Sequence, residues 1–326
     1  MRVGFFFSAA AMSGAFSGLL AAAIVQMDGL RGMRGWQWIF LLEGVFTICY
    51  GFVIAFILPN SPHDVSILSP AEAERCVRRL EEDGPAKESG RFDVKALLSA
   101  FRSPHILILC IVLFVNGTSL FGLANFAPSI VKSMGYEGTK TQLFTVPPFA
   151  IAFVATMISA YAADRYKARG ITAMSTSLLS IAGFALFLRS SSPAAHYTAL
   201  CLMITGIYST CPSLISWMPN NAAAGTKRAT AVAMAFISSN SGGILSTWTY
   251  PESDSPEYTL AAKLNLAFSC VTVGLVACEV ALLRWKNQRK QDDQLRDAAL
   301  EPVQRLSPEE QYNLLGDEHP DFEYTL

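Results

Sequence analysis

The sequence predicts an all-α membrane protein with eight transmembrane helices. Of its 326 residues, 52% are hydrophobic and only 16% are charged, whereas soluble domains carry about 25% charged residues. The mean hydropathy is +0.34, and apolar runs of roughly 20 residues recur with most charges between them. These runs do not alternate with period two, so they are not barrel strands, and only helices otherwise satisfy their own backbone in lipid.

A helix needs about 20 mostly apolar residues to cross the hydrocarbon core of a bilayer. Eight stretches meet this requirement: Val3–Val25, Gln37–Leu58, His105–Ala127, Leu143–Ala163, Ile171–Leu188, His196–Met218, Ala229–Thr249 and Leu260–Leu283. The first stretch also resembles a cleavable signal peptide, because Arg2 precedes it and Ala21 to Ala23 lie near its end. Its length, and the spacing of Gly14 and Gly18 for helix contact, favour a spanning helix.

The distribution of basic residues predicts the orientation. With the N-terminus in the cytoplasm, 19 of the 25 lysine and arginine residues fall on the cytoplasmic side and 6 on the other side. Cytoplasmic segments are the ones enriched in basic residues, so both termini are expected in the cytoplasm. The expected organisation is two helices in 1–58, a cytoplasmic loop in 59–104, six helices in 105–284, and a polar, mobile cytoplasmic tail in 285–326.

The long loop is expected to contain two helices. Ser69 can cap the first one, with Pro70 at its first position and Glu72 completing a capping box. The second places four apolar side chains on one face, which predicts an interfacial helix along the inner leaflet or against the bundle. These side chains are Val94, Leu97, Leu98 and Phe101.

Composition and motifs exclude several other classes. The charges nearly balance, with 25 basic and 26 acidic residues, so there is no basic footprint for a nucleic acid. The seven cysteines show no metal-ligand spacing and the four histidines are scattered, so we expect neither disulfides, a metal nor a cofactor. A nucleophile elbow and a phosphate loop are also missing from the sequence, which argues against an enzyme.

Five motifs occur in a characteristic order. They are GWQWIFLLEG at Gly35–Gly44, LFTVPP at Leu143–Pro148, Asp164-Arg165 with Arg169-Gly170, Trp217 to Arg228 with Asn220-Asn221 and Gly225, and GDEHPDF at Gly316–Phe322. In that order they resemble parts of fungal anion:cation symporters of the major facilitator superfamily. The corresponding parts are the starts of the sixth and eighth helices, the second cytoplasmic Asp-Arg motif, the loop after the tenth helix and the C-terminal tail. The resemblance covers essentially the whole chain and extends to nicotinic acid permease-like and allantoate permease-like transporters.

The resemblance implies a partial major facilitator bundle. The eight spans correspond to the fifth to twelfth helices, that is, two helices of the N-terminal half and a complete six-helix C-terminal half. The first four helices, with their charged substrate and proton-coupling residues, are missing from the match. The implied function is proton-coupled alternating-access transport of a small organic anion, such as a pyridine carboxylate or a ureide, across the plasma membrane. The alternative is a truncated, non-transporting remnant or scaffold that needs the missing N-terminal helices as a partner.

Polar side chains within the spans are the candidate substrate contacts, because such carriers bind near the midplane where water reaches them. Asn240 resembles a substrate-binding position of carboxylate-transporting relatives, although a helix-to-helix hydrogen bond would also explain it. The other candidates lie on two spans, four of them as a polar stripe on one span and one on another. For each of them, hydrogen bonding to the local backbone or packing is the alternative explanation. They are Ser213, Ser216, Asn116, Tyr208 and Trp217.

Charged residues near the span ends are candidates for gating and coupling. Asp164, Arg165 and Arg169 form a cluster at a cytoplasmic helix end that either gates one face or only anchors the helix. Glu43 lies within a span and is either a proton-titrating group or a structural partner for a missing helix. Glu279 is expected to snorkel to the inner interface near Arg284.

Overall fold

A computed structural model describes residues 2–65, 67–83, 94–190, 192–222, 225–254, 258–292 and 315–326. These residues form helices joined by turns, with no strand among them, which confirms the predicted all-α class. The chain divides into two compact units. The larger comprises residues 1–18 and 91–326, and the smaller comprises residues 19–90.

Helix α1 (Arg2–Ile24) begins in the larger unit and ends in the smaller one. The smaller unit continues with η1 (Val25–Met27), η2 (Leu30–Gly32), α2 (Gly35–Ile57), η3 (Pro62–Asp64) and α3 (Pro70–Asp83). The predicted capping box of α3 is confirmed in its Glu72 half: the Ser69 N–H donates to Glu72 Oε2 at 2.9 Å, and the Ser69 hydroxyl donates to the same oxygen at 2.7 Å. These two hydrogen bonds lower the pKa of the Glu72 carboxyl below its ordinary value.

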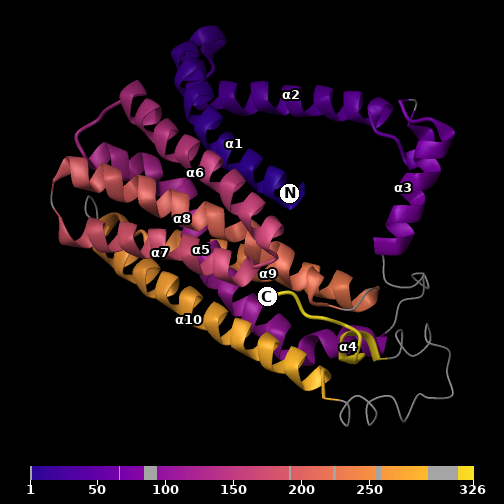
Figure 1. Ribbon diagram of the computed structural model, residues 1–326. Coiled ribbons are helices and arrows are strands. Elements are labelled where there is room, and N and C mark those ends of the chain that lie inside the picture. The colour runs from indigo at the N-terminus through magenta and orange to yellow at the C-terminus, as the bar shows by residue number, and fades with distance from the viewer. Residues whose placement is uncertain are drawn as a thin grey trace. The chain divides into compact units, whose positions relative to one another are not determined.

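The larger unit is a bundle of long helices (Figure 1). Its elements are α4 (Val94–Arg102), α5 (Pro104–Ser133), α6 (Thr139–Tyr166), α7 (Arg169–Arg189), α8 (Pro193–Asn220), α9 (Thr226–Thr249), η4 (Glu252–Asp254), α10 (Thr259–Lys290) and η6 (Gly316–Glu318). Helix α8 contacts α5, α6, α7 and α9. Its most apolar stretch is 83% buried, whereas that of α2 is 0% buried. Helix α8 is therefore the central helix of the bundle.

At two helix crossings, a glycine lets the backbone of one helix contact the backbone of its neighbour. A methyl group at Gly183 of α7 would lie 2.7 Å from the Met203 backbone nitrogen of α8. On α9, one at Gly242 would meet the Phe114 carbonyl of α5. Small residues at these crossings let the helices pack closely, as is common between helices in membranes.

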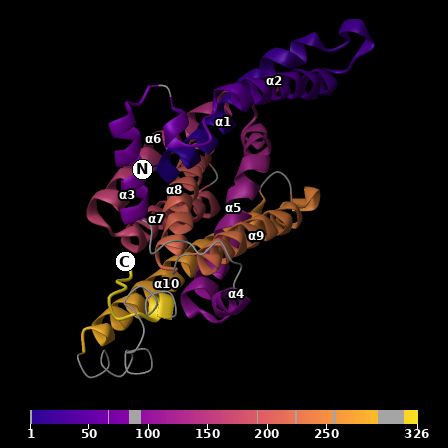
Figure 2. The ribbon, with the colours of Figure 1, turned by 90° about the vertical axis from the view of Figure 1, so that its right-hand side faces the viewer.

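Helix α4 lies beside the bundle end that also carries the C-terminal residues (Figure 2). It contacts α9 and α5, with Ala100 fully buried. Three of the predicted face residues remain about half exposed, namely Val94 at 56%, Leu98 at 51% and Phe101 at 52%. The helix thus contacts the bundle through a small residue and leaves an apolar face, as an interfacial helix would.

Seven helices among the described residues are long and apolar enough to cross a membrane, namely α1, α2, α5, α6, α7, α8 and α10. The predicted span Ala229–Thr249 is found as the 24-residue helix α9, but α9 is not among these seven, and the polar run Ser238–Ser241 lowers the hydropathy of the span. The eighth span therefore stays a prediction. Helices α5 and α10 contain 30 and 32 residues, more than predicted, because the helical backbone continues beyond the apolar run.

Candidate functional site

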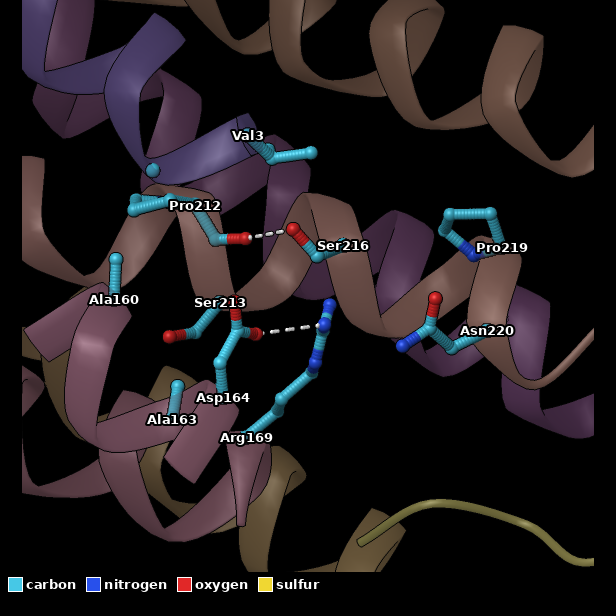
Figure 3. Close-up of a pocket in the computed structure, with 11 residues that line it drawn as sticks. Val3, Ala160, Ala163, Asp164, Arg169, Pro212, Ser213, Ser216, Pro219 and Asn220 are labelled. Atoms are coloured by element: carbon cyan, nitrogen blue, oxygen red, sulfur yellow. Dashed lines mark hydrogen bonds and ion pairs between the residues drawn. The ribbon is translucent and has the colours of Figure 1, made fainter. Parts of the chain in front are cut away.

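A cavity of about 300 Å³ lies among the ends of four helices of the larger unit (Figure 3). Helix α1 contributes Val3 and Gly4, and α7 contributes Arg169. The remaining lining residues are Ala160, Ala163 and Asp164 of α6, and Pro212, Ser213, Ser216, Pro219 and Asn220 of α8. Its wall is apolar on the α1 side and carries its charges on the α6–α7 side, so it offers both a surface for an apolar ring and a fixed charge.

An ion pair stands at the wall of this cavity. Arg169 Nη2 donates to Asp164 Oδ1 at 3.0 Å, with the side chains 18% and 32% exposed, respectively. Lys167 between them has a left-handed conformation with φ of 50°, which reverses the chain so that α7 starts beside the end of α6. With its amide oriented to satisfy both neighbours, Asn220 accepts from Arg169 Nη2 and donates to the Ser216 carbonyl, each at 3.3 Å. The pair therefore ties α6 and α7 to the end of α8.

Two serine hydroxyls of α8 also face the cavity. Ser216 Oγ donates to the Pro212 carbonyl at 2.7 Å. Its hydroxyl proton therefore forms a hydrogen bond within α8 rather than pointing into the cavity. Ser213 is only 3% exposed, and its hydroxyl has no hydrogen-bond partner among the described residues. A buried hydroxyl without a partner is unfavourable by about 1–3 kcal/mol, and a ligand in the cavity would provide the missing partner.

The cavity thus collects Asp164, Arg169, Ser213 and Ser216 from the predicted set, but no other member of that set lines it. Asn240 is exposed on α9 and donates to the Phe236 carbonyl at 2.8 Å. The exposed group also includes Arg165 and Glu43, whereas Asn116, Tyr208 and Trp217 are buried. Tyr208 packs edge-on against Phe149, and Trp217 Nε1 donates to the Thr325 carbonyl at 2.7 Å.

A buried histidine–carboxyl contact that the sequence did not reveal links α5 to α10. His105 Nδ1 pairs with Glu279 Oε1, and the side chains are 1% and 0% exposed. The prediction that Glu279 snorkels to the interface is therefore wrong, because the rotation of α10 turns it toward α5. The other polar atoms of the pair, His105 Nε2 and Glu279 Oε2, have no hydrogen-bond partner among the described residues.

The predicted mobile tail is also corrected in part. Residues 293–314 lie outside the described residues, but 315–326 pack against the helix ends, with Asp317, Phe322 and Tyr324 buried. The Arg169 N–H, at the start of α7, donates to the Leu326 carbonyl at 2.7 Å. The side-chain amides of Asn287 on α10 and of Asn221, just after α8, bond the same segment, which explains why polar composition alone did not reveal its order.

Long apolar helices around a small cavity with a paired charge define a multi-pass helical membrane protein. The chain belongs to the Major Facilitator Superfamily, whose family model matches residues 1–247.

Curated relatives are named as transporters. An uncharacterized transporter of Schizosaccharomyces pombe is 30% identical over 293 residues, covering 89% of this chain and 58% of the relative. The MFS-type transporter efuF of Hormonema carpetanum is 28% identical, covering 89% and 59%. The high-affinity nicotinic acid transporter of Saccharomyces cerevisiae is 26% identical, covering 99% and 59%. The chain thus spans about three fifths of the length of these relatives.

Proposed function

We propose that this chain carries out transmembrane transport of small organic anions, nicotinate- or ureide-like carboxylates, by proton-coupled alternating access. The observation that carries the proposal is the cavity, which combines Arg169, apolar surface and a buried Ser213 hydroxyl for which the described part of the chain offers no hydrogen-bond partner. Small-molecule sites have this character, mostly apolar with a few placed polar groups, and the volume of about 300 Å³ is at the small end of their range. The similarity to a nicotinic acid transporter supports the substrate class.

The Asp164–Arg169 pair provides a route to proton coupling. A guanidinium binds one carboxylate in a fork of two hydrogen bonds, so a substrate carboxylate and Asp164 compete for the same group. Protonation of Asp164 removes its charge and leaves Arg169 available to the substrate. One proton on Asp164 would then accompany one anion on Arg169, with the Ser213 hydroxyl as a further donor to the substrate.

The same pair would also gate the cavity. It joins the end of α6 to the start of α7, and Asn220 extends the connection to α8. When a substrate replaces Asp164 at Arg169, this connection loosens, and the helix ends can move relative to α1, whose Val3 and Gly4 form another wall of the cavity. A ligand shifts such an equilibrium only if it binds the two states differently, and competition for Arg169 satisfies that condition.

Uptake of radiolabelled nicotinate by cells that express the chain tests the proposal. We expect uptake above the empty-vector control, stimulated by an acidic outside pH. The Arg169→Lys variant retains the charge but loses the fork, and should reduce uptake by about tenfold, equivalent to roughly 1.4 kcal/mol. The matched control Arg165→Lys changes an exposed neighbour outside the cavity and should leave uptake unchanged.

Two results would decide against parts of the proposal. Uptake no higher than the empty-vector control, with the chain located at the membrane, would favour the alternative of a non-transporting scaffold that needs further helices. Uptake that Arg169→Lys leaves unaltered would remove the cavity from the binding site. Asn240, Asn116, Tyr208 and Trp217 would then be the next substrate contacts to test, and Glu43 the next coupling group.

A further inference from the structure

The last twelve described residues, 315–326, form what we call the C-terminal segment, which lies against the ends of α7, α8, α9 and α10. Lys290 of α10 holds the centre of the segment. Its ammonium donates to the carbonyls of Asp317, His319 and Phe322, at 2.6, 3.0 and 2.9 Å. An ammonium has three N–H donors, so this side chain is fully used by the backbone of the segment.

Two asparagine side chains bind the backbone at the end of the segment. Each donates to the carbonyl and accepts from the N–H of one residue, which is the pair of hydrogen bonds that a residue of a neighbouring β-strand would make. Asn287 donates to the Tyr324 carbonyl at 2.8 Å and accepts from the Tyr324 N–H at 3.0 Å. Asn221 does the same for Thr325, at 2.9 and 2.8 Å. These contacts use backbone groups, so they fix where the segment lies without requiring particular side chains at Tyr324 and Thr325.

Side chains of the segment add specificity. Lys227 of α9 forms an ion pair with Asp317. The Tyr324 ring lies under the Lys290 ammonium, 4.5 Å from it, and its hydroxyl donates to the Asp317 carbonyl at 2.8 Å. Burial, together with the charges of Asp317 and Glu318, raises the pKa of Tyr324, so the phenol stays protonated and able to donate.

The segment is connected to the cavity through two residues. Arg169 donates its backbone N–H to the Leu326 carbonyl, while its side chain pairs with Asp164 in the cavity wall. Trp217 donates to Thr325 and directly follows Ser216, which lines the cavity. The N–H of a first helical residue has no partner within its helix, so the segment satisfies a group that would otherwise be open.

We propose that the ends of α7 to α10 form a peptide-binding site whose ligand is the chain's own C-terminal segment, and that occupancy of this site stabilises the Asp164–Arg169 pair. Release of the segment would free the start of α7 to move. The binding stands independently of transport, whereas the importance of this coupling for gating rests on the function proposed above.

Hydrogen–deuterium exchange of the full-length chain in lipid nanodiscs tests the binding. The amides of Tyr324, Thr325 and Arg169 should exchange slowly in the unaltered chain. Lys290→Met removes three hydrogen bonds and should accelerate exchange of Tyr324 and Thr325 at least about tenfold. The matched control Arg289→Met removes a neighbouring charge that stacks on Trp285, and should have no such effect. Asn287→Ala, compared with Gln288→Ala, gives a second measurement if Lys290→Met fails to fold.

A synthetic peptide of residues 315–326 provides an independent result, because in excess it should compete with the attached segment and accelerate its exchange, whereas a scrambled peptide should not. Unprotected amides in the unaltered chain, equal effects of Lys290→Met and Arg289→Met, or no competition by the peptide would overturn the binding site.

The coupling has its own test, because coupling between two sites is reciprocal. Asp164→Asn should accelerate exchange of Thr325, whereas Arg165→Gln should not. No change with Asp164→Asn would refute the coupling and leave the binding site intact. Neither result depends on uptake, so failure of the proposed transport remains distinguishable.

Discussion

Replacing His105 by leucine is expected to destabilise the larger unit strongly, because it leaves Glu279 buried without its partner. Both side chains are essentially inaccessible, at 1% and 0% exposure. Leaving a buried polar group without its hydrogen-bond partner decreases stability by about 1–3 kcal/mol. For a chain of this length the unfolding midpoint falls by about 2 °C for each kcal/mol of stability lost, so it should fall by about 2–6 °C.

The double variant His105→Leu with Glu279→Leu should recover most of this loss. Replacing both members of a buried hydrogen-bonded pair by apolar side chains is often nearly neutral or stabilising, since no polar group is left without a partner. The effects of the two single variants should therefore not be additive, and the double-mutant cycle should return a coupling energy of about 1–3 kcal/mol.

Thermal unfolding of the chain purified in detergent provides the measurement, followed by tryptophan fluorescence and by the fraction that stays monodisperse after heating. Cys278→Ala is the control, because Cys278 is the exposed residue next to Glu279 on α10. A double variant as unstable as the sum of the single ones, or a His105→Leu midpoint equal to that of the control, would contradict the assignment of a stabilising buried pair.

Three further predictions concern the gate, the packing and the loop. Asp164→Asn should change the state-dependent labelling of cysteines placed near the cavity, whereas Arg165→Asn should not; an unchanged pattern at equal expression would argue against gating. Gly206→Val should lower the unfolding midpoint of the purified chain, because its side chain would meet the Ser180 backbone of α7; an unaltered midpoint would contradict this close contact. The lowered pKa of Glu72 means that its carboxylate stabilises the start of α3 above its ordinary pKa of 4.5 and that this contribution fades as the pH falls through the lowered value. Circular dichroism of a peptide of residues 67–83 should therefore lose helix on acidification, less so for Glu72→Gln than for Glu74→Gln, and equal losses would count against the cap.

The helices of the bundle could be predicted from the sequence because each is a local feature. Apolar length predicted α5 to α8 and α10, and the start of α3 was readable from three residues, since a cap involves only neighbours in the chain. The ends of α5 and α10 were missed, because a helix continues past its apolar run wherever its polar end is supported.

The partners within the site could be predicted only in part. Asp164 and Arg169 are five residues apart, so their pairing was accessible to the sequence. His105 and Glu279 are 174 residues apart, and Asn221 and Thr325 are 104 apart. No local pattern distinguishes such residues from an interfacial acid or a polar tail.

By itself the sequence determined a membrane-embedded, all-α chain, because the free energy of placing apolar side chains in lipid depends on composition along a helix. The tertiary structure decided which face of each helix turns inward, which polar groups pair there and that the last residues pack against the helix ends. These choices depend on the packing of neighbouring helices, so Ser213 and Arg169 acquire a shared cavity only when α6, α7 and α8 are in place.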